Sequence, residues 1–327
     1  MDAIGNTPLV PLHNLSQHLS LPGTVYAKLD SLSVGGSKKD RIARQIVLDA
    51  LADESLRPGQ PVVELTSGNT GTGLAICCAA LRFPFTAVMS TGNTPERARM
   101  MRALGAAVVL VEQCPGSVPG QVSGADLEKV EERTRQIVGE TGAFRADQFG
   151  RAGSYRAHYL STGPEAWAQS SQKIDSFVDF VGSGGTFVGV AKYLKEQQKS
   201  TQCFVVEPEA AAVMAAEWSG GEATGDGAHK VQGGGYSKTF TDLPLFDQNI
   251  SGVDPRSLVD GFYTVSDEEA TETARLIART EGIFGGFSGG ANVAAAVKVI
   301  REGKGEHVLA LICDNGLKYL STDLYDV

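Results

Sequence analysis

Residues 177–191 read FVDFVGSGGTFVGVA, and this stretch indicates the fold. Apolar residues run into a glycine-rich turn, and apolar residues at helical spacing follow the turn directly. A buried strand that passes through such a turn into a helix is the repeating unit of α/β proteins. Consecutive glycines let backbone N–H groups converge, and the positive end of the helix dipole adds to them, so the turn is a candidate phosphate site. Taken alone, an ordinary turn explains these glycines equally well.

The same alternation of short apolar runs and helix-period segments continues along most of the chain. The predicted strands are residues 61–65, 85–90, 107–112, 177–182, 203–208 and 307–313. The predicted helices are residues 41–51, 70–81, 95–104, 126–140, 187–198, 267–281 and 290–301. This order predicts an α/β fold with two doubly wound domains, whose parallel-type sheets are flanked by helices. The domains are expected to meet near Phe149, with a cofactor in the interdomain cleft. Two glycine-rich stretches, residues 114–124 and 218–236, are predicted to be loops.

Composition excludes several classes of partner. The chain has 327 residues, and 29 Lys and Arg against 38 Asp and Glu give a formal net charge of -9. This charge repels nucleic acid and anionic membrane surfaces, so neither is an expected partner. The longest apolar stretch, Leu74–Leu81, is too short to span a membrane, and the first residues lack a basic secretory signal. A cytoplasmic location is therefore predicted. Five cysteines without a CxxC pair or a Cys/His cluster predict reduced thiols and no metal site.

Two adjacent lysines lie in the glycine-containing segment GGSKKDR at residues 35–41. Lys39 stands at the start of a predicted helix, where the helix dipole disfavours a cation. If this amine is also desolvated, its pKa falls and it becomes a better nucleophile. A solvated lysine is the alternative, and the adjacent Lys38 is expected to point elsewhere and remain solvated. His158 is interpreted as a helix-packing residue rather than a base.

The segment TSGNTG at residues 66–71 precedes another predicted helix. One interpretation is a helix cap, for which Asn69 and Thr70 are suitable residues. The other is a carboxylate-binding loop that uses backbone N–H groups and the hydroxyls of Thr66, Ser67 and Thr70. The segment alone favours the cap.

The order of the motifs is more specific than any one of them. They are GNTPL at residues 5–9, GSKKDR at 36–41, TSGNTG at 66–71, GSGGT at 182–186 and GGFSGG at 285–290. In this order and at these distances they resemble the cysteine synthase and cystathionine β-synthase family, pyridoxal-phosphate enzymes of the tryptophan-synthase-β fold (fold type II). The resemblance covers nearly the whole chain, because it also includes DQFGRAGSYRAHYLSTGPE at residues 147–165 and DNGLKYLST at residues 314–322.

The resemblance implies pyridoxal 5'-phosphate as the cofactor and gives roles to individual residues. Lys39, immediately before the Asp-Arg pair, is the implied Schiff-base lysine and catalytic residue. Asn69 is the implied partner of the cofactor's 3'-oxygen, and Ser288 that of its pyridine nitrogen. The implied phosphate-binding residues are Gly182, Ser183, Gly184, Gly185 and Thr186. The implied substrate-binding residues are Thr66, Ser67, Gly68, Thr70, Gln148, Gly233 and Tyr236.

The resemblance also implies an organisation of the chain. Residues 40–149 are expected to form a smaller, mobile domain that closes over the substrate. Residues 1–39 and 150–327 are expected to form a larger cofactor-binding domain. Two such chains are expected to associate as a homodimer.

The implied reaction is β-replacement on an O-activated serine (O-acetylserine, O-phosphoserine or serine) through an aminoacrylate. A small nucleophile would then give cysteine or a related β-substituted alanine. The neutral Ser288 hydroxyl does not hold a proton on the ring nitrogen, which favours β-elimination and β-replacement over transamination; Ser288 is also suited to capping a helix. The alternatives are a β-eliminating lyase of the serine/threonine dehydratase or cysteine desulfhydrase type, and a non-catalytic synthase-like scaffold.

Several positions depart from the family's usual motifs. Ser33 and Val34 stand where Asn-Pro is common, and Ser183 stands where Thr is usual. Gly234 replaces a bulkier aliphatic residue, which is expected to widen the pocket for a larger nucleophile. Tyr236 resembles the cystathionine-synthase branch of the family. These departures leave the leaving group and the nucleophile open.

Overall fold

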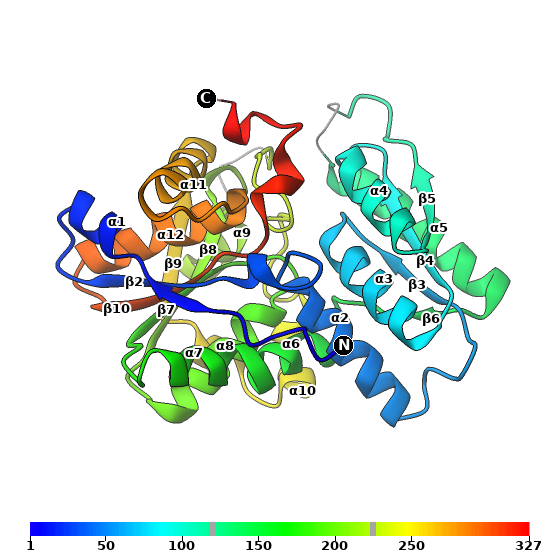
Figure 1. The fold of residues 1–327 in the computed structure, drawn as a ribbon, viewed down its shortest axis with the longest axis horizontal. Helices are drawn as coiled ribbons and strands as arrows, with labels where there is room; N and C mark the ends of the chain where they lie inside the picture. Colours follow the sequence, from blue (N-terminus) through cyan, green and yellow to red (C-terminus); the bar gives the residue numbers. More distant parts are fainter. Residues whose placement is uncertain (118–121, 223–226, 327) are drawn as a thin grey trace.

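The structure, a computed structural model, describes residues 1–117, 122–222 and 227–326, and its strands form two sheets (Figure 1). The larger sheet has the order β1 (Leu9–Pro11), β2 (Thr24–Lys28), β10 (His307–Leu311), β7 (Ser176–Phe180), β8 (Gln202–Pro208) and β9 (Gly261–Val265). The smaller sheet has the order β5 (Ala107–Val111), β4 (Phe85–Ser90), β3 (Val62–Leu65) and β6 (Phe144–Arg145). Strands β1 and β2 are antiparallel, and the other pairs are parallel.

Helices connect the strands and cover the sheets. They are α1 (His13–His18), α2 (Lys39–Ala52), α3 (Asn69–Leu81), α4 (Pro95–Ala103), α5 (Gly124–Thr141), α6 (Gly153–Ala157), α7 (Gly163–Gln169), α8 (Gly185–Gln197), α9 (Val213–Ser219), α10 (Gln248–Ser251), α11 (Asp267–Glu281) and α12 (Phe287–Arg301). A π-helical turn, His158–Thr162, joins α6 to α7. Short 3₁₀ turns occur at Asp30–Leu32, Glu209–Ala211, Pro244–Phe246, Pro255–Leu258, Gly316–Tyr319 and Asp323–Tyr325.

Alternating side chains of the central strands build a core on each face of the larger sheet. On β10, Val308 and Ala310 enter the core that contains α11 and α12, whereas Leu309 and Leu311 enter the core that contains α8. Figure 1 shows α11 and α12 on one side of this sheet and α7 and α8 on the other. Each fully buried Leu or Val contributes about 1.5–3 kcal/mol relative to an exposed one. A sheet covered on both faces is the reason that its central strands are continuous apolar runs.

The predicted fold class, α/β with parallel-type sheets flanked by helices, is confirmed. The six predicted strands occur within two residues of the expected bounds, and the seven predicted helices within three. The strands of the smaller sheet all fall inside residues 40–149, and those of the larger sheet all fall outside. The division into a moving and a fixed domain remains a prediction. No helix in the described part of the chain is long and apolar enough to cross a membrane.

Four of the strands were not predicted from the sequence. Strands β1 and β6 have only three and two residues, too few to show a period. Strand β2 ends in the charged residue Lys28, which is fully buried, and β9 begins at a glycine. The predicted loops at 114–124 and 218–236 contain residues 118–121 and 223–226, which lie outside the described residues; Trp218 belongs to the end of α9.

Candidate active site

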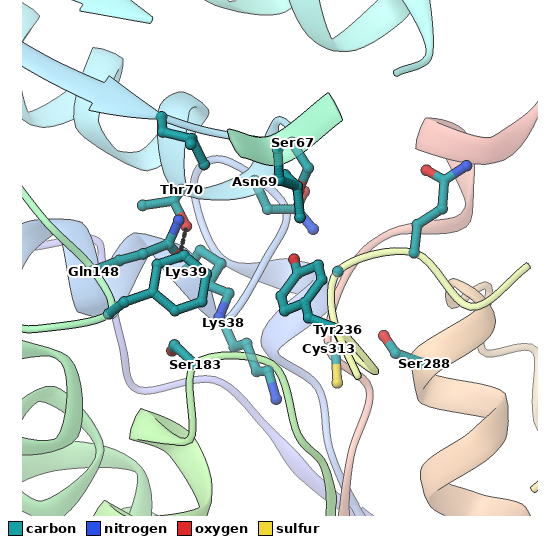
Figure 2. Close-up of a pocket in the computed structure, with 15 residues that line it drawn as sticks. Lys38, Lys39, Ser67, Asn69, Thr70, Gln148, Ser183, Tyr236, Ser288 and Cys313 are labelled. Atoms are coloured by element: carbon teal, nitrogen blue, oxygen red, sulfur yellow. Dashed lines mark hydrogen bonds between the residues drawn. The ribbon is translucent and has the colours of Figure 1, made fainter. Parts of the chain in front are cut away.

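One cavity lies where segments of both sheets meet, at the carboxyl ends of parallel strands (Figure 2). Leu65 ends β3, Ser183 follows β7 and Cys313 follows β10. This edge is where open α/β sheets bind ligands. The lining residues are Lys38, Lys39, Leu65, Ser67, Asn69, Thr70, Leu127, Gln148, Phe149, Ser183, Gln232, Gly233, Tyr236, Ser288 and Cys313.

The glycine turn after β7 is closely packed, and of residues 182–186 it is Ser183 that lines the cavity. Gly184 is the N-cap of α8 and has φ +86°, a conformation that favours glycine. A Cβ would lie 2.5 Å from the Gly233 carbonyl oxygen at Gly182 and 2.4 Å from the Phe246 ring at Gly184. At Gly185 a Cβ would lie 2.9 Å from the Ser154 backbone. The turn therefore accepts glycine alone at these positions.

Polar groups at this turn lack protein partners. Within the described residues, no side chain caps α8, and the buried Ser183 Oγ has no hydrogen-bond partner. Buried polar groups are normally satisfied, so these donors fit an anionic ligand. A phosphate ester is an anion that helix N-termini bind, and the predicted phosphate-binding residues thus fit pyridoxal phosphate. Figure 2 shows Ser183 at the edge of the cavity.

His158 supports this turn from behind. Its Nδ1 is 2.8 Å from Thr162 Oγ1, and its Nε2 is 3.2 Å from Thr186 Oγ1. Burial lowers the pKa of His158 well below its usual value, with smaller contributions from nearby lysines and arginine. A neutral, buried imidazole that is bonded to two threonines agrees with the predicted packing role. Thr186 also lies behind the turn, because it does not line the cavity.

A second helix with a glycine N-cap begins on the opposite wall. Gly68, with φ +135°, is the N-cap of α3 and has no side chain of its own to cap the helix. Arg97 Nη1 donates to the Ser67 carbonyl oxygen at 2.7 Å. Thr66 Oγ1 accepts from the backbone N–H groups of Gly68 and Gly71, both at 2.9 Å. Thr66 was predicted to bind substrate, yet it does not line the cavity, and its hydroxyl oxygen orders the loop instead.

Thr70 and Gln148 meet inside the cavity. Thr70 Oγ1 donates to Gln148 Oε1 at 2.6 Å, a bond drawn in Figure 2. Glu64 lies behind them and accepts from the backbone N–H of Asp147 at 2.7 Å and from that of Gln148 at 3.4 Å. Burial raises the pKa of Glu64 to about 7, although Arg145 opposes the shift. Glu64, on strand β3, therefore holds the backbone at Gln148, and the Gln148 side chain in turn orients Thr70.

Asn69 lines the cavity, and both the nitrogen and the oxygen of its side-chain amide form hydrogen bonds to other side chains. Its Nδ2 donates to Asp314 Oδ2 at 2.7 Å, and its Oδ1 accepts from Lys318 Nζ at 2.8 Å. These bonds tie the start of α3 to the segment that follows β10. The predicted contact between Asn69 and the cofactor's 3'-oxygen remains a prediction.

Both lysines of the GGSKKDR motif line the cavity. Burial, with Lys38 as the next cause, lowers the pKa of Lys39 to about 8. The expectation that Lys38 remains solvated is wrong: Lys38 is buried, and its Nζ lies 2.7 Å from Asp179 Oδ1. Residue 38 precedes α2, so the helix does not turn the two neighbouring side chains apart.

Ser288 and Cys313 lie side by side at the base of the cavity. Both residues line the cavity, and the Cys313 sulfur accepts from Asn292 Nδ2 at 3.3 Å. The alternative role of Ser288 as an N-cap does not hold, because α12 begins at Phe287 and Gly286 is its N-cap. Ser288 therefore faces the cavity from within the first turn of the helix.

The loop after residue 231 closes the cavity on one side. The Tyr236 ring lies edge-on to Phe149 with centroids 6.0 Å apart, and both residues line the cavity together with Ser67. Gly234 does not widen the pocket as expected, because a Cβ there would lie 2.5 Å from Phe180 Cε1. The Phe180 ring already fills the space that a larger residue would take.

The described residues that line the cavity are rich in hydrogen-bond donors and amines and contain no acidic side chain, neither aspartate nor glutamate. The described residues also contain no group of three or more His, Cys, Asp or Glu that is placed to hold a metal ion. The cavity thus presents two lysines, several hydroxyls and two helix N-termini, a donor set for an anionic organic ligand with a reactive carbonyl.

Comparison with known proteins decides the family. Residues 1–314 match the protein family described as pyridoxal-phosphate dependent enzyme. The chain belongs to this family. The enzyme is 36% identical over 324 residues to a cysteine synthase of Staphylococcus aureus, which spans 98% of this chain and 95% of the relative. It is also 36% identical over 330 residues to the O-ureido-L-serine synthase of Streptomyces lavendulae, across 100% and 92% of the two chains. The crystal structure of a cysteine synthase from Entamoeba histolytica matches it with a TM-score of 0.85 at 31% identity, covering 100% of this chain and 90% of that chain.

The expected family, enzyme class and cofactor are therefore confirmed. Of the predicted site residues, Lys39, Ser67, Asn69, Thr70, Gln148, Ser183, Gly233, Tyr236 and Ser288 line one cavity. The sequence analysis missed Lys38, Asp179 and Cys313. Cys313 had a usable signal, because it is the last residue of the predicted strand 307–313. Asp179 had a weaker one, as the single charge within an apolar strand.

Proposed function

We propose that this enzyme exchanges the β-substituent of an O-activated serine for a small nucleophile and releases cysteine or a related β-substituted alanine. The observation that carries the proposal is the base of the cavity, where Ser288 presents a neutral hydroxyl and no lining residue of the described chain is a carboxylate. A carboxylate would hold a proton on the pyridine nitrogen, and a hydroxyl does not. The weaker electron sink favours departure of a β-substituent over transamination.

The α3 wall supplies a place for the substrate carboxylate. Ser67, Thr70 and Gln148 line this wall, and the start of α3 adds its dipole. Charge-assisted hydrogen bonds to such groups are stronger than neutral ones. Because the phosphate turn lies on α8, an amino acid bound at α3 is held between the two helices with Lys39 beside it.

Residues of this chain would hold the cofactor and move the proton. Gly182, Ser183, Gly184 and Gly185 would bind the phosphate, and Ser288 would meet the ring nitrogen. When bound, pyridoxal phosphate withdraws electrons from the α-carbon of the amino acid. Lys39 Nζ, whose pKa of about 8 leaves part of the amine free near neutral pH, would take the proton from that carbon. Phe149 and Tyr236 close the cavity and limit the access of water.

The relatives support this product class, since they include proteins named cysteine synthase and O-ureido-L-serine synthase. The substrate is accordingly an amino acid. A cytoplasmic location and a homodimer belong to the same proposal and rest on the family resemblance and the composition.

The proposal is tested by product analysis. The enzyme is incubated with O-acetylserine, O-phosphoserine or serine, each with and without sulfide, a thiol or an amine, and products are identified by mass spectrometry. At least one pair is expected to give a β-substituted alanine at a rate that depends on the nucleophile. Pyruvate as the sole product in every pair contradicts the proposal and supports the β-eliminating lyase.

A further inference from the structure

Two adjacent lysines face one cavity, although a single amine is needed to attach the cofactor. Lys38 and Lys39 both line it, and Figure 2 shows them between Ser183 and Cys313. A lysine bonds covalently to an aldehyde only through its free amine, because an ammonium has no lone pair. The surroundings of the two nitrogens therefore decide which of them is reactive.

The two nitrogens differ in their contact with carboxylate. Lys38 Nζ forms an ion pair with Asp179 Oδ1 at 2.7 Å, and the two side chains are only 9% and 2% exposed. Within the described residues, no carboxylate lies within ion-pair distance of Lys39 Nζ, and Asp179 and Asp314 act on it from farther away. Contact with Asp179 raises the pKa of Lys38 above its usual value despite burial, whereas burial and the Lys38 charge lower that of Lys39.

Asp179 is held in place by a network of its own. Burial raises the pKa of its carboxyl, the nearby Asn292 opposes this shift, and Asn292 Oδ1 accepts from the Phe180 N–H at 2.6 Å. Asn292 Nδ2 donates to the Leu311 carbonyl oxygen at 2.9 Å. Strands β7 and β10 and helix α12 thus fix the carboxylate beneath the cavity. Desolvation makes a buried ion pair a weak source of stability, so this network calls for a further role.

The other titratable groups around Lys38 do not replace Asp179. Cys313, after β10, lies near Lys38, but burial raises the pKa of its thiol to about 11. His158, before α7, is neutral because burial lowers its pKa. Lys39, on α2, repels Lys38. Asp179 is the acid that the described residues place against the Lys38 ammonium.

We propose that Asp179 decides which of the two lysines carries the proton, and so makes Lys39 rather than Lys38 the amine that bonds to the cofactor. Asp179 is a positioning residue in this account, since it acts through Lys38. The bond formed is a C=N bond between Lys39 Nζ and the aldehyde carbon. The aldehyde oxygen leaves with both protons of the free amine as one water, so no oxidant or reductant is needed. The inference rests on the cofactor site and not on the identity of the nucleophile.

Reduction with borohydride followed by peptide mass mapping tests the proposal, because it records which lysine holds the cofactor independently of turnover. Four forms loaded with pyridoxal phosphate are compared: the wild type, Lys39→Ala, Lys39→Ala/Asp179→Asn and Lys39→Ala/Glu207→Gln. Glu207 is a matched control, a buried carboxylate on β8 that bonds to the backbone of α9 and not to a lysine. We expect the label on Lys39 in the wild type, no label in Lys39→Ala or the Glu207 control, and a label on Lys38 when Asp179 is also replaced.

Two results overturn the proposal: a label on Lys38 in Lys39→Ala with Asp179 intact, or no label in a folded Lys39→Ala/Asp179→Asn protein. If that double variant does not fold, Lys38→Met/Asp179→Asn provides the test, because it removes both charges together. The apparent pKa for covalent uptake of the cofactor by Lys39 is then expected to rise, and an unchanged pKa contradicts the proposal. A wild type that is labelled on Lys39 but forms no β-substituted alanine refutes the proposed function and leaves this inference intact.

Discussion

The units β3–α3 and β7–α8 have the same construction and face each other across the cavity. Each contains a buried strand with one carboxylate, Glu64 in β3 and Asp179 in β7. Each continues through a glycine N-cap with positive φ into a 13-residue helix. Because a glycine N-cap has no side chain, it leaves N–H groups of the first turn available to anions, although in α3 Thr66 Oγ1 already accepts from the Gly71 N–H.

The two units differ in what supports the glycine and in what lines the loop. Gly184 is backed by the Phe246 ring and its neighbour Gly185 by the Ser154 backbone, whereas Gly68 is backed by the Arg97 side chain. The α8 turn therefore meets an aromatic ring and backbone, whereas Gly68 meets the buried stem of Arg97, whose Cβ would lie 2.9 Å from an added Cβ. The α3 loop also presents Ser67, Asn69 and Thr70 to the cavity, and the α8 loop presents Ser183. The difference supports the proposed assignment of the substrate carboxylate to the α3 loop and of the phosphate to the α8 turn.

The largest expected effect comes from adding a side chain at Gly184. Gly184→Val places a β-branched residue at φ +86° against the Phe246 ring, and strain at such a position costs about 1–3 kcal/mol before the clash is added. Cofactor affinity is expected to fall about 100-fold or more, with a lower melting temperature. Absorbance titration with pyridoxal phosphate measures the affinity. Unchanged cofactor affinity would contradict the assignment of the phosphate to the α8 turn.

The matched change on the other wall is expected to separate substrate from cofactor. Gly68→Ala puts a Cβ 2.3 Å from Arg97 Cδ and 2.9 Å from Arg97 Cβ, and φ +135° also disfavours alanine. A displaced loop is expected to raise KM for the amino acid about 10-fold, equivalent to about 1.4 kcal/mol, and to leave cofactor affinity unchanged. Steady-state kinetics and the same cofactor titration measure the two effects. A loss of cofactor affinity with unchanged KM would reverse the assignment of the two walls.

A third helix, α2, also begins at the cavity, but there it presents a lysine amine and not an anion-binding turn. Its first residue is Lys39, whose pKa burial lowers to about 8. The free amine therefore dominates above pH 8, and covalent uptake of pyridoxal phosphate by the apo protein is expected to slow about tenfold per pH unit below it. Stopped-flow absorbance between pH 6 and about 9 measures the rate. A rate that is flat across this range would show that Lys39 is already a free amine at pH 6 or is not the reacting group.

The last expected effect, on stability rather than on ligand binding, concerns the carboxylate behind the α3 loop. Burial raises the pKa of Glu64 to about 7 from 4.5, so the folded protein binds this proton more tightly than the unfolded chain. The stabilisation is complete at low pH and is lost as the pH rises from 4.5 through 7. Relative to Glu64→Gln, the wild type is expected to lose on the order of 1–3 kcal/mol of unfolding free energy over this interval. Urea unfolding at several pH values measures the difference, and parallel curves for the two proteins would contradict it.

The sequence predicted the strands and helices, which have periodic patterns of apolar residues. It did not predict contacts between residues that are far apart in the chain. The strands and helices around Gly68 and Gly184 carry apolar periods that reveal them. The Lys38–Asp179 pair joins residues that are 141 positions apart, and neither has a local pattern that indicates the other. Gly234 shows the same limit, because only the fold reveals that Phe180 fills the space its missing side chain leaves.

The central claim is that one amine, Lys39 Nζ, forms the covalent bond to pyridoxal phosphate. Borohydride reduction of the loaded wild-type enzyme, followed by peptide mass mapping, tests it most directly. The account predicts one modified peptide with the added mass on Lys39. A modification on Lys38 or any other lysine, or none in a folded protein that retains the cofactor, would contradict it.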